Sequence, residues 1–236
     1  MTDLDSQTGY WDAVAATKTF THPLYAPWLA GVDRGAAVLD YGCGYGRTLE
    51  ALTAHGFRDL AGVDTSAGMI ERARALLAAP RFDVLTAPPE TGRPDASVDL
   101  VVLFAVLTCV PRADAQRRLI AELDRVLRPG GLLYVSDYLL QDDARNRERY
   151  ERFAERTGDH AYGVFETSDG AVCRHHTEDR LRTLLAGFEP VDCRRVTVST
   201  MNGHEAAGAQ FLVRKPPAPH GQDRGLGLRT TAGPGA

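Results

Sequence analysis

A short apolar run that passes directly into a glycine-rich turn is the feature that most constrains this chain. Residues 37–41 are typical of a buried strand, residues 42–46 read Gly-Cys-Gly-Tyr-Gly, and a helical pattern begins at Thr48. Glycines let the backbone turn tightly and approach a ligand closely, and a helix N-terminus adds oriented N–H groups. Asp64 closes the next apolar run, where a carboxylate can accept both hydroxyls of a ribose. The combination of the glycine-rich turn with Asp64 favours a nucleoside site over a plain tight turn.

The rest of the first 140 residues alternates apolar runs with amphipathic stretches. Further strands are expected at residues 59–64, 82–86, 98–104 and 132–136, and helices at residues 48–54, 68–77 and 115–127. The segment Arg-Pro-Gly-Gly at 128–131 is expected to stop the last helix. Alternation at this spacing predicts right-handed βαβ units and a doubly wound, mostly parallel sheet. Ligands of such sheets bind outside the carboxyl ends of the strands.

The last third of the chain changes character. Residues 145–156 form a highly charged helical pattern, and residues 162–176 contain Ser-Asp-Gly between two strand-like runs, which predicts a hairpin. Thr177 is expected to cap a helix, and two final strands are expected near residues 191–200 and 207–214.

The bulk properties favour one cytoplasmic domain. The 236 residues suit a single α/β domain at 1–215, and the net charge of −4 argues against a dedicated nucleic-acid binder. Neither a targeting signal nor a stretch long enough to span a membrane is evident. The four cysteines are far apart, which favours reduced thiols over a zinc site or disulfides. Residues 216–236 have the composition of a disordered tail, with partner docking as the alternative.

The glycine spacing distinguishes between two nucleoside cofactors. The order is G-x-G-x-G, not the G-x-G-x-x-G that seats the pyrophosphate of NAD. Asp40 lies just before the turn, where it would repel a pyrophosphate and attract the ammonium and sulfonium of S-adenosylmethionine (SAM).

Four segments together resemble a known family. VLDYGCGYGR, GVDTSAGMIERAR, SVDLVVLFAVLTCVP and LRPGGLLYVSD, which fall within residues 38–137, are similar in order and spacing to the signatures of class I SAM-dependent methyltransferases. The resemblance implies SAM as cofactor and a seven-stranded sheet whose last strand is antiparallel. It also implies a set of cofactor-binding residues, namely Asp40, Gly42, Gly44, Asp64, Thr65, Met69, Thr86 and Phe104.

Two positions depart from the family pattern. Thr86 and Ala87 stand where the family often has an acid that receives the adenine amino group. Cys109 stands where small-molecule members often carry a histidine after the fourth strand. Adenine recognition is then expected to rest on backbone groups, or SAM affinity to be weak.

Substrate-facing groups are expected from three places. The first is an N-terminal lid at 1–30, the second is the end of the fifth strand, and the third is an insertion at 139–176. The predicted catalytic residues are Asp137, Tyr138, His175 and His22, and the predicted substrate contacts are Tyr10, Trp11, Phe20, Cys109, Tyr162 and Arg174. There are two alternatives. The lid helix would merely pack on the sheet, or the pair Asp137 and Tyr138 at the strand end would only cap or form ion pairs. His175 and His176 are adjacent on a strand and point to opposite faces, so no metal site is expected.

The leading hypothesis is methyl transfer from SAM to O, N, S or C of a small metabolite. Direct displacement mainly needs alignment and exclusion of water, so a general base is optional. One alternative keeps the fold but uses the cleft for cyclisation or elimination. Another is a supporting subunit of a partner enzyme. A monomer or homodimer is expected, with no nucleic acid or membrane as partner.

Overall fold

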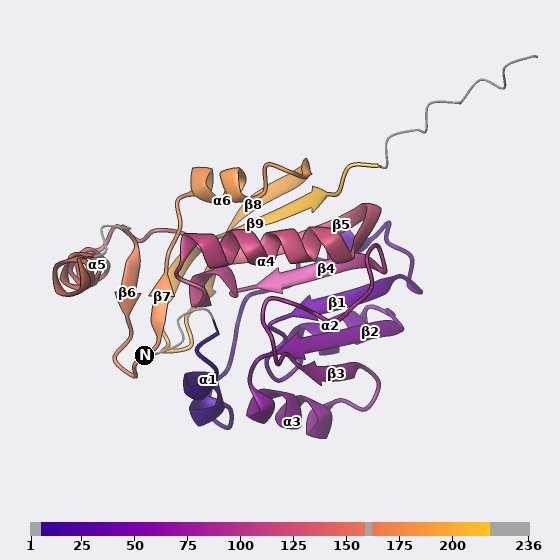
Figure 1. Ribbon diagram of the computed structural model, residues 1–236, viewed down its shortest axis with the longest axis horizontal. Coiled ribbons are helices and arrows are strands. Elements are labelled where there is room, and N and C mark those ends of the chain that lie inside the picture. Colours follow the sequence, from indigo (N-terminus) through magenta and orange to yellow (C-terminus); the bar gives the residue numbers. More distant parts are fainter. Residues whose placement is uncertain (1–5, 159–161, 218–236) are drawn as a thin grey trace, which may run out of the picture.

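Seven strands form one sheet in the computed structural model, which describes residues 6–158 and 162–217 (Figure 1). The order across the sheet is β3-β2-β1-β4-β5-β9-β8. The strands are β1 Ala37–Tyr41, β2 Asp59–Asp64, β3 Arg81–Val84, β4 Val98–Phe104, β5 Leu127–Tyr138, β8 Glu189–Ser199 and β9 Glu205–Arg214. β1 to β5 pair in parallel, whereas β9 lies antiparallel between β5 and β8. The predicted doubly wound sheet with an antiparallel last strand is confirmed.

Helices cover both faces of this sheet. One face carries α2 (Arg47–Ala54), α3 (Ala67–Leu76) and the 3₁₀ turn η1 (Ala26–Leu29), and the other carries α4 (Ala113–Val126) and α6 (Glu178–Leu184). β4 lies between the two layers, and its side chains alternate between the two buried clusters. This double burial explains why the β4 sequence is almost uniformly apolar.

Local signals set most of the helix boundaries. Ser66 caps α3 by accepting a hydrogen bond from the Met69 amide at 3.1 Å, and Thr177 caps α6 in the same way through Arg180. Two boundaries differ from the expectation. α4 ends at Val126 without the help of the Pro-Gly-Gly segment, which belongs instead to the start of β5. β3 ends at Val84, so Thr86 is not part of it.

The segment between β5 and α6 extends from one end of the molecule. It contains α5 (Ala144–Thr157) and a two-stranded hairpin of β6 (Val164–Glu166) and β7 (Val172–Arg174) (Figure 1). A small cluster of its own, which includes Tyr150 and Phe165, holds these elements together. The N-terminal helix α1 (Thr8–Val14) packs beside α3. Most of the predicted disordered tail, residues 218–236, lies outside the described residues.

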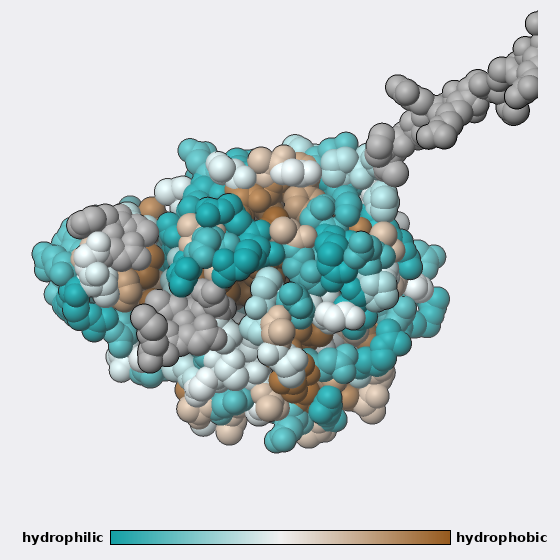
Figure 2. All heavy atoms as spheres, viewed as in Figure 1, coloured by the Kyte–Doolittle hydropathy of each residue, from teal (hydrophilic) through white to brown (hydrophobic). Residues whose placement is uncertain are grey.

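The face of the molecule shown in Figure 2 is largely hydrophilic, with hydrophobic residues in small scattered areas. Among the described residues, no helix combines the length and the apolar character that a membrane crossing needs.

Candidate active site

A cavity of about 580 Å³ lies at the carboxyl ends of the parallel strands. Its walls come from the segments that follow β1, β2, β3, β4 and β5, and from α1, α5, the β6–β7 hairpin and the β8–β9 loop. Predicted site residues that line it are Trp11, Phe20, Gly42, Gly44, Asp64, Thr65, Met69, Phe104, Cys109, Tyr138 and His175. Predicted site residues outside the lining are Tyr10, His22, Asp40, Thr86, Asp137, Tyr162 and Arg174.

The glycine turn after β1 requires residues without a side chain. Gly42 and Gly44 have positive φ angles of 71° and 53°. A Cβ atom on Gly42 would lie 2.4 Å from Cγ2 of Val106, and one on Gly44 would lie 2.8 Å from the ring of Phe20. The backbone of the turn therefore borders the cavity directly, which is what close approach of a ligand needs.

Asp64 ties this turn to the end of β2. Its Oδ2 accepts the Gly44 amide at 2.9 Å and its Oδ1 accepts the Ser66 amide at 2.9 Å. Burial raises the pKa of Asp64, while these backbone donors oppose the increase. The carboxylate lines the cavity and retains lone pairs for further donors.

Asp40 lies behind the turn and does not line the cavity. The residue is 2% exposed, and its Oδ2 has no hydrogen-bond partner among the described residues. Burial raises its pKa to about 8, against the lowering effect of Arg47. A buried carboxyl oxygen without a hydrogen-bond partner is suited to a cation in the neighbouring cleft.

The expected adenine end of the cavity is apolar. Met69, Leu85 and Pro88 line it beside Thr65. Thr86 is exposed, because β3 has ended and the chain turns Leu85 inward. The assignment of Thr86 to the cofactor site is therefore not supported by the geometry.

The N-terminal segment covers the cavity from one side. The Phe20 ring stacks on Tyr45 at a centroid distance of 5.6 Å, and Trp11 meets Phe20 edge-on at 6.2 Å. Asp12 fastens α1 to α3, accepting from the Ser66 hydroxyl at 2.6 Å and from the Gly68 amide at 3.1 Å.

Polar contacts join this segment to two others. Lys18 Nζ lies 2.6 Å from Asp169 of the β6–β7 hairpin and donates to Asn202 of the β8–β9 loop, also at 2.6 Å. Tyr10 does not reach the cavity because its hydroxyl donates to Asp169 at 3.0 Å. Residues far apart in sequence thus close one side of the cavity together.

Gln7 is a structural residue that sequence analysis missed. Its Nε2 donates to the carbonyls of Cys109 and Val172, each at 2.8 Å, and its Oε1 accepts the Val172 amide at 2.8 Å. The side chain thereby connects the N-terminus to β7 and to η2 (Leu107–Cys109). Nothing in the polar N-terminal sequence signals such long-range contacts.

The end of β5 presents Tyr138 to the cavity and turns Asp137 away, because neighbouring residues on a strand point to opposite faces. Asp137 is fully buried and accepts the amides of Tyr138 at 2.8 Å and Thr108 at 3.1 Å. Burial raises its pKa to about 7. Asp137 holds the η2 turn in place, so a direct catalytic role does not fit its position.

His22 is buried behind Tyr138 and does not line the cavity. Its Nδ1 lies 2.8 Å from the Ser136 hydroxyl, and its ring meets Tyr138 edge-on at 4.6 Å. Burial lowers its pKa to about 3, which makes it a poor proton acceptor at neutral pH.

His175 does line the cavity, and its Nδ1 lies 2.6 Å from the Tyr150 hydroxyl. His176 faces the opposite way, with Nε2 3.9 Å from Asp137. Burial lowers the pKa of both histidines, so both rings are neutral at pH 7. In residues 6–158 and 162–217, no group of three or more His, Cys, Asp or Glu side chains could hold a metal ion.

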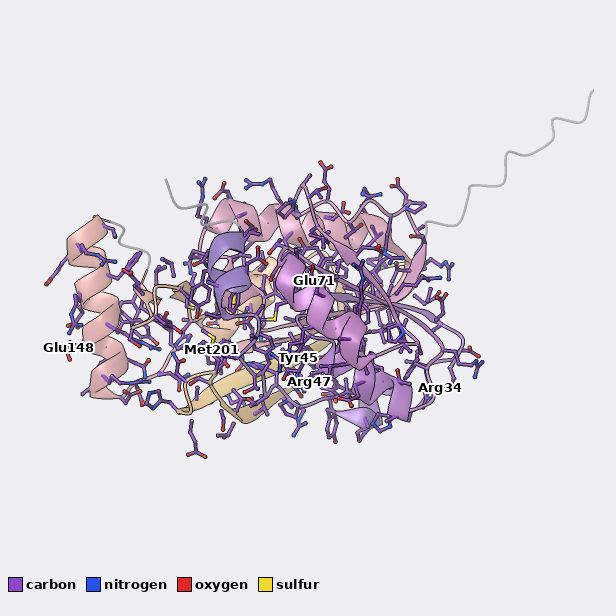
Figure 3. All side chains as sticks on the ribbon, turned by 90° about the horizontal axis from the view of Figure 1, so that it is seen from below. Arg34, Tyr45, Arg47, Glu71, Glu148 and Met201 are labelled. Atoms are coloured by element: carbon purple, nitrogen blue, oxygen red, sulfur yellow. The ribbon has the colours of Figure 1, made fainter. Side chains whose placement is uncertain are left out.

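Two predicted substrate contacts point elsewhere. Tyr162 is 53% exposed and rests against the Tyr150 ring. Arg174 is 7% exposed and donates to the Pro111 carbonyl at 3.0 Å. The insertion reaches the cavity through the β6–β7 hairpin and through α5, a helix that lies apart at one end of the molecule (Figure 3) and contributes Glu148 to the lining.

Comparisons with known proteins agree with this geometry. A family model described as a methyltransferase domain matches residues 39–135. The 27-O-demethylrifamycin SV methyltransferase of Amycolatopsis mediterranei is 30% identical over 211 residues, which cover 86% of the chain and 73% of that relative. Trans-aconitate 2-methyltransferase of Methylobacterium radiotolerans is 39% identical over 115 residues, or 48% of the chain and 39% of that relative.

A solved structure is similar over most of the chain. The crystal structure of a SAM-dependent methyltransferase from Methanosarcina mazei has a TM-score of 0.76 and 25% identity, covering 84% of this chain and all of that one. Several curated relatives match over a shorter part, since the chain covers between 39% and 52% of the length of four of them.

Proposed function

Because the chain belongs to the class I SAM-dependent methyltransferases, we propose that it transfers the methyl group of SAM to a small-molecule metabolite. The observation that carries this proposal is a single cavity that joins the glycine turn and Asp64 to an aromatic region under the N-terminal segment. Its volume of about 580 Å³ suits small ligands. The relatives named for rifamycin and trans-aconitate methylation act on small molecules, which supports the same substrate class here.

The residues of the cavity fit SAM. The turn at Gly42 and Gly44 would allow close approach of the cofactor to the backbone, and Asp64, which lines the cavity, would accept the ribose hydroxyls. Met69 and Thr65 would border the adenine, and the unpartnered oxygen of Asp40 would favour the cationic amino acid end from behind the turn. When bound, SAM supplies an electrophilic methyl group on its sulfonium.

The remaining residues would align the substrate and exclude water. Trp11, Phe20 and Phe104 line the cavity with aromatic rings, and Lys18 links the N-terminal segment to the β6–β7 hairpin. In this proposal residues 1–30 form a lid and residues 139–176 the substrate-side wall of one domain at 1–215. Tyr138 and His175 would supply hydrogen bonds to the substrate.

A calorimetric titration with SAM tests the cofactor half of the proposal. We expect micromolar binding that Asp64→Ala abolishes, and no binding of NADH as control. Incubation with methyl-labelled SAM and a low-mass metabolite extract tests the transfer, with S-adenosylhomocysteine (SAH) and a labelled small molecule as products. Absence of SAM binding by the wild type would overturn the proposal.

One observation favours a second candidate function. Neither His22 nor Asp137 lines the cavity, and burial lowers the pKa of His175, which does line it. Such a site is compatible with cyclisation or elimination of a small molecule, a reaction that consumes no SAM. Turnover that persists when SAM is omitted would favour this alternative.

A further inference from the structure

Four arginines of α5 line the cavity on one side of the helix. Arg145, Arg149, Arg152 and Arg156 follow one another at intervals of four, three and four residues, which places them on one face. The sequence alone indicates only that this helix is highly charged. The spacing instead produces a cationic stripe along the wall of the substrate half.

Two of these arginines have a carboxylate partner and two do not. Arg152 pairs with Glu148 on the same helix, and Arg156 pairs with Glu166 of β6. Among the described residues, neither Arg149 nor Arg145 forms an ion pair with an acidic side chain. The inner part of the stripe therefore has excess positive charge beside the cavity.

Arg149 is the innermost of the four and is held in a fixed orientation. Its guanidinium carbon lies 3.4 Å from the ring centroid of Phe165, and its buried Nε has no hydrogen-bond partner among the described residues. A half-buried guanidinium without an anion is costly unless a ligand supplies one. The guanidinium also forms a hydrogen bond with the side chain of Tyr150, and stacking on an aromatic ring leaves its other N–H groups available for an oxyanion.

A neighbouring donor completes the arrangement. The Tyr150 hydroxyl accepts the Gln141 amide at 3.3 Å, so its own proton is available for Nδ1 of His175 at 2.6 Å. That tautomer places the ring proton of His175 on Nε2. His175 lines the same cavity and would act as a neutral hydrogen-bond donor to a ligand held by Arg149.

The surroundings of these donors are aromatic. Phe153, Phe165, Trp11 and Tyr138 line the same cavity. Rings of this kind bind an apolar or aromatic body, and the cation at the wall then selects for an acidic group attached to it.

We propose that Arg149, supported by Arg145 and by Nε2–H of His175, forms an oxyanion subsite, and that the substrate is a small apolar molecule carrying a carboxylate or phosphate group. This inference rests on the proposed function, because it assigns a substrate class to the same cavity. The acidic group would orient the substrate body toward the glycine turn.

Binding to the SAH-saturated protein tests the subsite without any methyl transfer. The probes are benzoate, phenyl phosphate and benzamide, which share a ring and differ in charge. We expect benzoate or phenyl phosphate to bind about tenfold more tightly than benzamide, the usual scale of a charged hydrogen bond. The tighter of the two anions identifies the acidic group as carboxylate or phosphate.

Matched variants show whether Arg149 causes the preference. Arg149→Gln should remove the difference between benzoate and benzamide, and Arg149→Lys should restore only part of it. Arg147→Gln is the control, since Arg147 lies on the same helix, is exposed and contacts the Asp142 carbonyl outside the cavity. SAH affinity and the melting temperature of each variant report whether the protein is folded.

Equal affinity for benzoate and benzamide, or no binding of any probe, would overturn the oxyanion subsite. The proposed function fails on a different measurement, namely the absence of SAM binding or of labelled product. A preference for anions without any methyl transfer would support the subsite and disprove the activity. Methyl transfer only to neutral metabolites would support the activity and disprove the subsite.

Discussion

At the residue scale, Asp40 links cofactor binding to pH. Burial raises the pKa of Asp40 to about 8, which favours the protonated carboxyl group at pH 7. Bound SAM would place positive charge nearby and favour the ionised form, so binding should release a proton. SAM affinity should therefore increase as the pH rises toward about 8 and level off above it.

Calorimetry in buffers of different ionisation enthalpy measures the released proton directly. Asp40→Asn removes the titrating group, and its SAM affinity should vary little between about pH 6 and about pH 9. An equally steep pH dependence in this variant would assign the proton to another group.

Gly44 yields a second prediction at this scale. Gly44→Ala places a side chain at a φ of 53° and within 2.8 Å of the Phe20 ring, which costs on the order of 1–3 kcal/mol. We expect at least tenfold weaker SAM binding, because both the turn and Phe20 must move. Gly31→Ala is the control, since its Cβ would meet nothing within 4 Å. Similar SAM affinities for the two variants would show that the turn tolerates a side chain.

The role of a single residue could be predicted only where a short stretch of sequence around it indicates that role. Gly42, Gly44 and Asp64 could be placed because the strand, turn and acid lie in short contiguous motifs. Gln7 and Arg149 act across long sequence separations, to β7 and over Phe165, and no local pattern reveals such contacts. The pair Asp137 and Tyr138 at the end of β5 could not be resolved from the sequence. Alternation along a strand predicts that only one of the two side chains faces the cavity, but which one does so depends on how the strand packs.

At the scale of elements, the N-terminal segment, the β6–β7 hairpin and the β8–β9 loop meet at Lys18. Lys18→Met keeps the length of the side chain and removes its contacts to Asp169 and Asn202. We expect severalfold faster release of SAH and a higher KM for the substrate, because the three segments separate more readily.

Stopped-flow measurement of SAH release checks this prediction. Lys215→Met is a matched control, since Lys215 pairs with Asp124 at the other end of β9, away from the cavity. An unchanged release rate in Lys18→Met would mean that these contacts do not limit opening.

Most helices and strands could be predicted, because the periodicity of apolar residues and the positions of capping residues indicate the same boundaries. β1, β2 and β4 match the expected ranges, and Thr177 caps α6 as predicted. The predicted start of β5 was wrong, because Leu127 already pairs with Val98 of β4, and Gly130 and Gly131 form backbone hydrogen bonds with Lys215 just beyond β9. Long-range pairing of this kind overrides local propensity.

At the scale of the whole molecule, the cavity contacts both layers and several loops, so a ligand should stabilise the entire fold. SAH at a hundred times its Kd should add about 2.7 kcal/mol to the free energy of unfolding. For a chain of this size, that corresponds to an increase of roughly 5–10 °C in Tm. Differential scanning calorimetry measures the shift, and Asp64→Ala should show little of it. A shift of equal size in that variant would place the ligand elsewhere.

The α5 segment and its hairpin contact the rest of the molecule through few elements, while the glycine turn and Asp64 belong to the central sheet. Evolution can therefore alter the two halves of the cavity at different rates. In the proposed function, substitutions along the arginine stripe would change which metabolite is accepted and would leave the glycine turn and Asp64 in place. On that proposal, exchange of this segment between related chains would change the acceptor specificity.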